Sequence, residues 1–176
     1  EEAGTHLSLS WKAADDKIGL FVLADDTPHA TNLAYKADKS AARTTFSPTG
    51  TAAKWKDEFS QHDFYAYYPY GEAASQSHSQ VTVSVPAVQI QSEAGNMEHL
   101  ADLDLLYAKK ENTVLTDDGS IELRFVHMFS VLELTLNSDK GSVTTDEVIF
   151  RCQNPDEVVA TKNAKINLST GKVDYS

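Results

Sequence analysis

Alternation between apolar and polar residues is the dominant pattern along this chain. It has a period of two and is clearest in five short runs: residues 7–11, 81–85, 121–125, 166–168 and 173–175. Successive side chains of a β-strand point to opposite faces of a sheet, so the pattern predicts half-buried strands. Denser apolar runs at residues 17–23 and 104–108 predict strands that are covered on both faces.

Polar turn sequences separate these runs. They are Asp15-Asp16, Asp25-Asp26, Asp117-Asp118-Gly119 and Ser169-Thr170-Gly171, and the last two are typical of hairpins. Helical patterns are scarce, and we expect at most a turn or two of helix at residues 52–59 and 96–103. The sequence therefore predicts an all-β fold, an antiparallel two-sheet β-sandwich with one or two short helical turns.

The alternation changes phase between residues 126 and 130. Apolar residues occupy the odd positions from Ile121 to Phe125, but the even positions from Leu132 to Leu136. A slip of one residue moves every side chain to the opposite face of a sheet. We therefore predict a β-bulge here, or a strand that crosses between the two sheets.

Five aromatic rings fall between Phe64 and Tyr70, in the sequence FYAYYPY. They occupy both phases of the alternation, so both faces of a strand would carry rings. Our main interpretation is an interior strand buried on both sides, because aromatic residues favour strands and dominate cores. The alternative is an exposed platform on which Tyr65 and Tyr67 stack against sugars.

Composition and charge narrow the choice of partners. The chain has 176 residues, which fits one domain over residues 1–176, and its formal net charge of -11 argues against nucleic acids and anionic membranes. No run approaches the roughly 18 apolar residues of a membrane-spanning helix. The single cysteine, Cys152, follows an apolar run at residues 148–150 that resembles a strand, and it is expected to be a buried structural thiol.

No catalytic, cofactor-binding or metal-ligating pattern stands out. The six histidines lack the spacings of metal ligands, and the GxSxG, Walker and GxGxxG motifs are absent from the sequence. A calcium site at Glu98, Asp102 and Asp104 is disfavoured because the surrounding loop lacks the rhythm of calcium loops. A secreted hydrolase would require two carboxylates that converge in a cleft, and nothing in the sequence singles out such a pair.

Six segments, read in order, resemble the fimbrillin-like family, the surface pilins and the anchor or tip proteins of Bacteroidetes. The segments are DKIGLFV at 16–22, DFYAYYPY at 63–70, VSVPA at 83–87, DLLYA at 104–108, LRFVHMFSVL at 123–132 and INLSTGKV at 166–173. The resemblance covers nearly the whole chain. Members of this family are exported as lipoproteins, matured by proteolysis at the cell surface, and built of two transthyretin-like β-sandwich domains.

The resemblance implies that this chain is a non-enzymatic fimbrial subunit or adhesin of the outer membrane surface, without cofactors. Its partners would be other fimbrial subunits, joined by donor-strand exchange at an open sheet edge, and a host or bacterial surface ligand. A lipid anchor would belong to the precursor. The chain resembles the first domain only, and the second domain, which usually carries the donor strand, is expected to be absent.

Two further interpretations concern particular residues. Arg43, in the sequence Ala42-Arg43-Thr44, is a candidate site for the maturation protease. As an alternative function, a surface glycan-binding module is suggested by Tyr65, Tyr67 and the two tryptophans, Trp11 and Trp55.

Overall fold

The computed structural model describes residues 10–72, 77–85, 88–93, 96–101, 103–131, 134–141, 144–145, 147–151, 153–154 and 163–174. Within these residues lie nine strands and one short 3-10 helix, η1 (Glu98–Leu100). The strands are β1 (Lys17–Ala24), β2 (Thr27–Ala37), β3 (Phe46–Pro48), β4 (His62–Tyr68), β5 (Val81–Ser84), β6 (Leu106–Thr113), β7 (Val126–His127), β8 (Asn163–Asn167) and β9 (Lys172–Asp174). All of the strand pairs are antiparallel, in two sheets, which confirms the predicted fold class.

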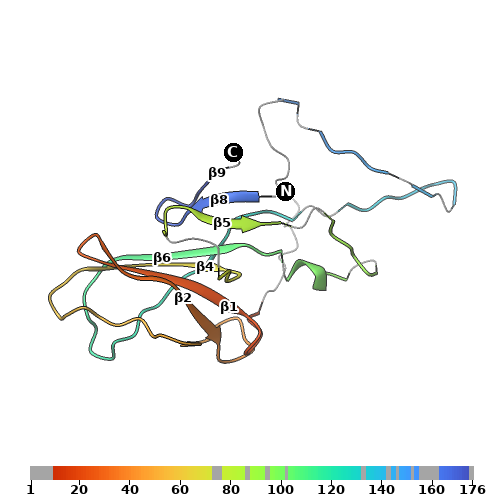
Figure 1. Ribbon diagram of the computed structural model, residues 1–176. Helices are drawn as coiled ribbons and strands as arrows, with labels where there is room; N and C mark the ends of the chain where they lie inside the picture. Colours follow the sequence, from red (N-terminus) through yellow and green to blue (C-terminus); the bar gives the residue numbers. More distant parts are fainter. Residues whose placement is uncertain are drawn as a thin grey trace, which may run out of the picture.

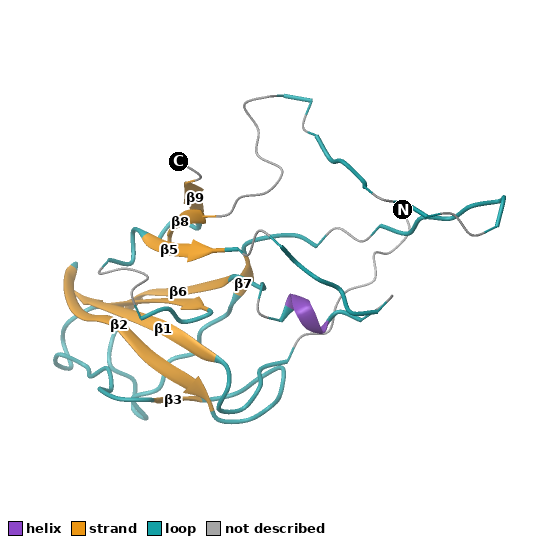
Figure 2. Cartoon of the chain, turned by 45° about the vertical axis from the view of Figure 1, so that its right-hand side comes forward, coloured by secondary structure: helices purple, strands orange, loops and turns teal. Residues whose placement is uncertain are grey.

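Six strands form a large sheet in the order β3-β2-β1-β4-β6-β7 (Figures 1 and 2). Its middle is built by β1 and β4, which pair without interruption from Gly19–Tyr67 to Ala24–His62. The predicted turn at Asp25-Asp26 joins β1 to β2, and both aspartates have positive φ, 48° and 60°. Two successive positive φ angles are typical of hairpin turns that match the twist of their strands.

The small sheet, β5-β8-β9, covers one face of the large sheet (Figures 1 and 2). We call the core between the sheets the inter-sheet core; its buried members are Phe21, Tyr65, Tyr67, Val81, Val83, Leu105, Ala164, Ile166 and Leu168. The predicted hairpin at residues 169–171 joins β8 to β9. Its Gly171 has a φ of 67°, and the Asn167 carboxamide oxygen accepts the backbone N–H groups of Ser169 and Thr170.

The other face of the large sheet has a core of its own, which we call the outer core. Its buried members are Ile18, Leu20, Val22, Phe64, Ala66, Tyr68, Leu106 and Ala108. Loops cover this face in place of a sheet, and they contribute half-buried apolar side chains that include Trp11, Trp55 and Phe125. The large sheet is therefore covered on both sides.

The aromatic run forms β4, in the interior of the large sheet. Phe64 and Tyr68 belong to the outer core, and Tyr65 and Tyr67 to the inter-sheet core. All four are at most 8% exposed. The main interpretation of the aromatic run, an interior strand buried on both faces, is confirmed.

The change of phase near residue 126 also has a structural counterpart. Ile121, Leu123 and Phe125 pack on the outer core, whereas Met128 and Phe129 pack on the inter-sheet core. Between them, β7, an edge strand of the large sheet, pairs with β6 through two residue pairs. The chain thus passes from one face of the large sheet to the other at its edge. The predicted β-bulge or strand shared by the two sheets is not seen among the described residues, where β7 pairs with β6 without a register shift.

Residues 52–59 do not form the helical turn that the sequence suggested. Their backbone N–H groups bond to distant or non-helical side-chain acceptors instead: Ala53 to the Tyr35 hydroxyl at 2.7 Å, and Lys56 to Nε2 of His62 at 3.0 Å. These bonds replace the i to i−4 ladder of a helix. The expected turn within residues 96–103 is present as η1.

Candidate functional site on the exposed apolar segments

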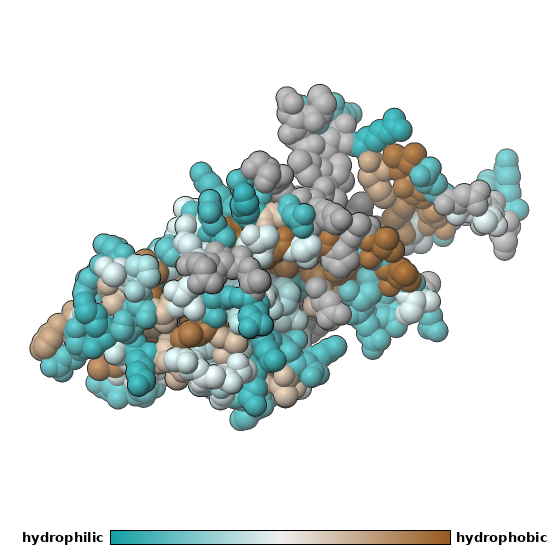
Figure 3. All heavy atoms as spheres, in the orientation of Figure 1, coloured by the Kyte–Doolittle hydropathy of each residue, from teal (hydrophilic) through white to brown (hydrophobic). Residues whose placement is uncertain are grey.

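Large apolar side chains are exposed at one end of the molecule. We call their segments the exposed apolar segments: residues 88–90, 131–136 and 147–151, without the undescribed positions 132 and 133. Their exposed members are Val88, Ile90, Val131, Leu134, Leu136, Val148, Ile149 and Phe150, each at least 44% exposed. Figure 3 shows brown, hydrophobic atoms gathered where these segments leave the sheets, in line with Figures 1 and 2.

Two sequence predictions are therefore wrong for the residues described here: the strand at residues 132–136 and the strand-like run at residues 148–151. Leu134 and Leu136 keep the alternation with Thr135, but residues 134–138 and 147–151 lie outside the assigned strands. The sequence pattern specifies a strand face, but a strand also needs a neighbour to bond its backbone. Leu132 and Cys152 are outside the described residues, so the expectation of a buried thiol stays a prediction.

Val88 and Ile90 were not identified from the sequence as functional. Their exposed fractions are 73% and 74%, among the highest of the large apolar residues described. The alternating stretch Val88-Gln89-Ile90-Gln91 was the available signal: an alternation resumes beyond Pro86, with its apolar residues at even positions where those of β5 are at odd ones. These residues follow β5, whose only strand neighbour among the described residues is β8. The exposed apolar segment at residues 88–90 thus comes shortly after β5, an edge strand of the small sheet.

Tyr65 and Tyr67, the predicted sugar-stacking residues, lie inside the protein, 4% and 1% exposed. The Tyr65 ring stacks on His78 with centroids 4.5 Å apart, and its hydroxyl donates to Glu111 at 3.0 Å. Burial, followed by this bond to a carboxylate, raises the pKa of Tyr65. The Tyr67 hydroxyl is bonded to Asn32 at 2.8 Å. Neither ring is accessible to a sugar in this structure.

Arg43 lies on the surface, in the connection between β2 and β3. Its guanidinium contacts Glu122 at 2.9 Å, and the two side chains are 89% and 77% exposed. A protease could therefore reach the side chain. Cleavage after Arg43 would, however, divide β1 and β2 from the rest of the large sheet, in which β1 pairs with β4 through six residue pairs.

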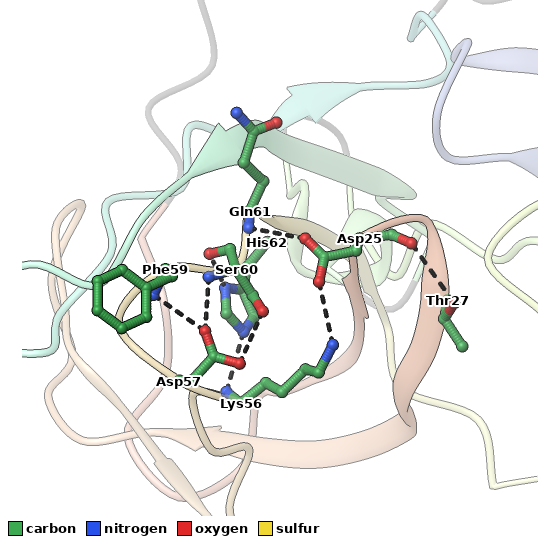
Figure 4. A network of polar contacts seen from close by, with 8 residues as sticks. All are labelled: Asp25, Thr27, Lys56, Asp57, Phe59, Ser60, Gln61 and His62. Carbon is green, nitrogen blue, oxygen red and sulfur yellow. Dashed lines mark hydrogen bonds and ion pairs between the residues drawn. The ribbon is translucent and has the colours of Figure 1, made fainter.

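A polar network lies at the start of β4 and contains the residue types of a catalytic triad: a serine, a histidine and two aspartates (Figure 4). Its members are Asp25, Lys56, Asp57, Ser60 and His62. The Ser60 hydroxyl donates to Asp57 at 2.8 Å. The buried His62 ring accepts the Lys56 backbone N–H at Nε2, and its Nδ1 lies 3.0 Å from the Ser60 carbonyl oxygen. Both ring nitrogens are thus occupied by backbone groups, and His62 does not act as a base toward the Ser60 hydroxyl.

Electrostatics agree that this network is structural. The Ser60 hydroxyl, then the Ser60 and Phe59 backbone N–H groups, lower the pKa of Asp57. Lys56, at 3.0 Å, is the main cause that lowers the pKa of Asp25. Both carboxylates are thereby favoured in their ionised, hydrogen-bonded form. Asp57 holds the loop before β4 together, and Asp25 fixes that loop to the β1–β2 turn through Lys56 and the Gln61 backbone N–H.

The described residues also lack two other kinds of functional feature. In that part of the chain, groups of three or more histidine, cysteine, aspartate or glutamate side chains with a metal-binding arrangement are absent. Helices of the length and apolar character needed to cross a bilayer are likewise absent from the described residues.

Comparison with known proteins identifies the family of this chain. The family model described as fimbrillin-like matches residues 5–176. The chain is similar to a protein of Bacteroides uniformis described as a candidate fimbrium subunit, Fim1C, with 30% identity over 138 residues. The alignment covers 77% of this chain and 42% of that protein, so the chain spans less than half of its relative's length. Solved structures give no significant match. With a family match over almost its entire length, the chain belongs to the fimbrillin-like family.

Proposed function

We propose that this protein is a non-enzymatic structural subunit of a fimbrium on the cell surface. The family supports a structural role, and the relative from Bacteroides uniformis is described as a fimbrium subunit. The charge of -11 keeps such a chain soluble during export and gives it no general affinity for nucleic acid. Its partners are other fimbrial subunits.

Subunits assemble, in this proposal, by addition of a strand from one chain to another. The observation that carries it is the pair Leu134 and Leu136, 51% and 57% exposed, which alternate with polar residues but lie outside the assigned strands. Backbone pairing with a neighbouring strand would supply main-chain hydrogen bonds, and burial of the alternating leucines would supply specificity. Exposed apolar patches of this kind mark interaction sites.

Site-directed charges test this assignment. The double variant Leu134→Asp/Leu136→Asp is expected to abolish filaments seen by electron microscopy of the expressed gene product after surface-type proteolysis. Burying one charged side chain costs far more than burying a leucine, so two should block the contact. The free energy of unfolding of the unassembled chain should stay within about 0.5 kcal/mol of the parent, because both positions are exposed.

Thr135→Asp is the matched control, since the side chain between the leucines faces the other way along an extended chain. It should leave filaments intact. Normal filaments from the double variant would contradict strand addition at this segment. Absence of filaments from the parent chain, under conditions that assemble its relatives, would contradict the proposed function itself.

A further inference from the structure

A cleft lies at the end of the large sheet where four neighbouring strands begin or end. At this end Tyr68 of β4 is in register with Leu106 of β6, which in turn pairs with His127 of β7. β1 begins beside them, and its Lys17 carbonyl accepts the Tyr70 backbone N–H at 2.9 Å. Side chains at converging strand ends are held by rigid elements, which is the usual requirement for a binding site.

The cleft consists of two adjoining cavities of about 400 and 180 Å³. Lys12, Asp16, Tyr68 and Ala101 line both of them, so they form one continuous surface. The larger cavity falls within the range of roughly 300–1,000 Å³ that is common for small-molecule pockets. The cleft is separate from the exposed apolar segments and from the fimbrial assembly proposed above.

The polar groups of the cleft are fixed in position. Both carboxylate oxygens of Asp16 accept hydrogen bonds, one from the Tyr68 hydroxyl at 2.9 Å and the other from the Lys12 backbone N–H at 2.7 Å. Asp104 lies 2.6 Å from Nδ1 of His127. Each carboxylate oxygen has two lone pairs, so Asp16 and Asp104 can accept further hydrogen bonds from a ligand.

The charges of the lining indicate the kind of ligand. Two ammonium groups, on Lys12 and Lys17, lie among three carboxylates, on Asp15, Asp16 and Asp104. A strong cation would meet the lysines, and an anion would meet the carboxylates. The lining therefore favours an uncharged ligand that both donates and accepts hydrogen bonds.

Aromatic rings supply the remaining feature. Trp11, Tyr70 and Phe125 line the cleft, and all three are half-buried. Trp11 is held by edge contacts with Phe46, Tyr68 and Phe125, at centroid distances of 5.0–5.3 Å. An aromatic face offers a flat apolar surface with a negative quadrupole, which attracts polarised C–H groups.

We propose that this cleft binds a neutral saccharide. Hydroxyl groups of the sugar donate hydrogen bonds to Asp16 and Asp104. The C–H face of a sugar ring lies against Trp11 or Tyr70. A saccharide combines uncharged hydroxyl groups with an apolar ring face, which is the combination that this lining presents.

The experiment is a printed array of neutral and sialylated glycans, with spermidine as a cationic probe, followed by titration of the best-bound glycan by calorimetry. Neutral glycans are expected to be retained. Asp104→Asn should weaken their binding about tenfold or more, because it removes a charge-assisted hydrogen bond. Asp26→Asn is the matched control: the same change, at the far end of β1 from the cleft, should leave binding unchanged.

Tyr70→Leu is a second variant, which keeps an apolar side chain but removes the aromatic ring. It should also weaken binding. Thermal unfolding of each variant identifies any that do not fold. Three results would overturn the proposal: retention of spermidine or of sialylated glycans alone, binding by Asp104→Asn and Tyr70→Leu equal to that of the control, or no retained glycan. None of them bears on filament formation, so failure here is distinguishable from failure of the proposed function.

Discussion

β4 and the exposed apolar segment around Leu134 both have sequences that favour a strand, but their surroundings are opposite. β4 carries large side chains in both phases of the alternation, and the segment around Leu134 carries them in one phase. The rings of β4 are at most 8% exposed, because β1 and β6 pair with it and two cores cover its faces, whereas Leu134 and Leu136 are more than half exposed. A sequence pattern thus indicates that a segment can form a strand. Whether it does depends on neighbouring strands that can pair with its backbone. The four predictions below probe this difference.

Truncation of a β4 ring should have the largest effect. Tyr67→Ala is expected to lower the free energy of unfolding by about 3–5 kcal/mol, because it leaves a cavity in the inter-sheet core and removes the hydroxyl bonded to Asn32. Leu136→Ala, in the exposed segment, should change it by less than about 0.5 kcal/mol. Urea unfolding measures both. Equal losses would mean that the segment is packed in solution.

Adding an atom next to the Tyr67 ring should also lower the free energy of unfolding, but by less than removing the ring does. A Cβ atom at Gly19 would lie 2.0 Å from Cε1 of Tyr67 and 2.8 Å from Oδ1 of Asn32. Gly19→Ala should therefore cost about 1–3 kcal/mol through overpacking. Gly50→Ala is the control, since nothing lies within 4 Å of its would-be Cβ. Thermal unfolding compares the two, and a neutral Gly19→Ala would show that Tyr67 is free to move.

Acid should weaken the contact between Tyr65 and His78. Burial lowers the pKa of His78 in the folded state, so the unfolded chain binds the proton more readily. The contribution is fully present above the ordinary histidine pKa of about 6.5, and it is lost as the pH falls through the lower folded value. His78→Phe, which keeps a ring on Tyr65, should show a flatter decline of the unfolding midpoint between neutral and acidic pH. An identical decline would remove His78 as its cause.

The smallest effect is expected at the surface ion pair. Glu122→Gln removes the negative charge from the ion pair with Arg43, but both side chains are largely exposed and screened by water. We expect the free energy of unfolding to change by less than about 0.5 kcal/mol. Denaturant titrations at low and high salt measure it. A loss above 1 kcal/mol would indicate that Arg43 fixes the loop between β2 and β3, and that its accessibility to a protease is lower than its exposure implies.

Local pattern was sufficient for much of the fold. The alternation located β5 and the end of β8, the dense apolar run at residues 17–23 located β1, and the rings of β4 in both phases predicted its burial on both faces. β2 was not among the predicted strands, since its sequence TPHATNLAYKA is polar and most of its residues are only half-buried or exposed. Residues 121–125 pack as the alternation requires, yet they are not a strand because they cover a sheet face rather than extend an edge.

The candidate sites were harder to predict, for a physical reason. The exposure of Leu134 depends on which strands are present to cover it, and the cleft depends on Asp16, Asp104 and His127 meeting at one end of the sheet. These residues are separated by up to 111 positions, between Asp16 and His127. Spacing along a chain carries no information about contacts set by sheet order. The family resemblance, in contrast, was readable from the sequence, because it rests on consecutive strand motifs.

The shortness of β7 has a mechanical consequence. Only two residue pairs, Leu106–His127 and Tyr107–Val126, hold it to the sheet. Tension applied to the chain beyond Phe129 would first reach Phe129 and Met128, which pack on the inter-sheet core, and the Met128 N–H bond to the Leu105 carbonyl at 2.8 Å. Once these contacts gave way, the two β7 pairs would be loaded one after the other rather than together.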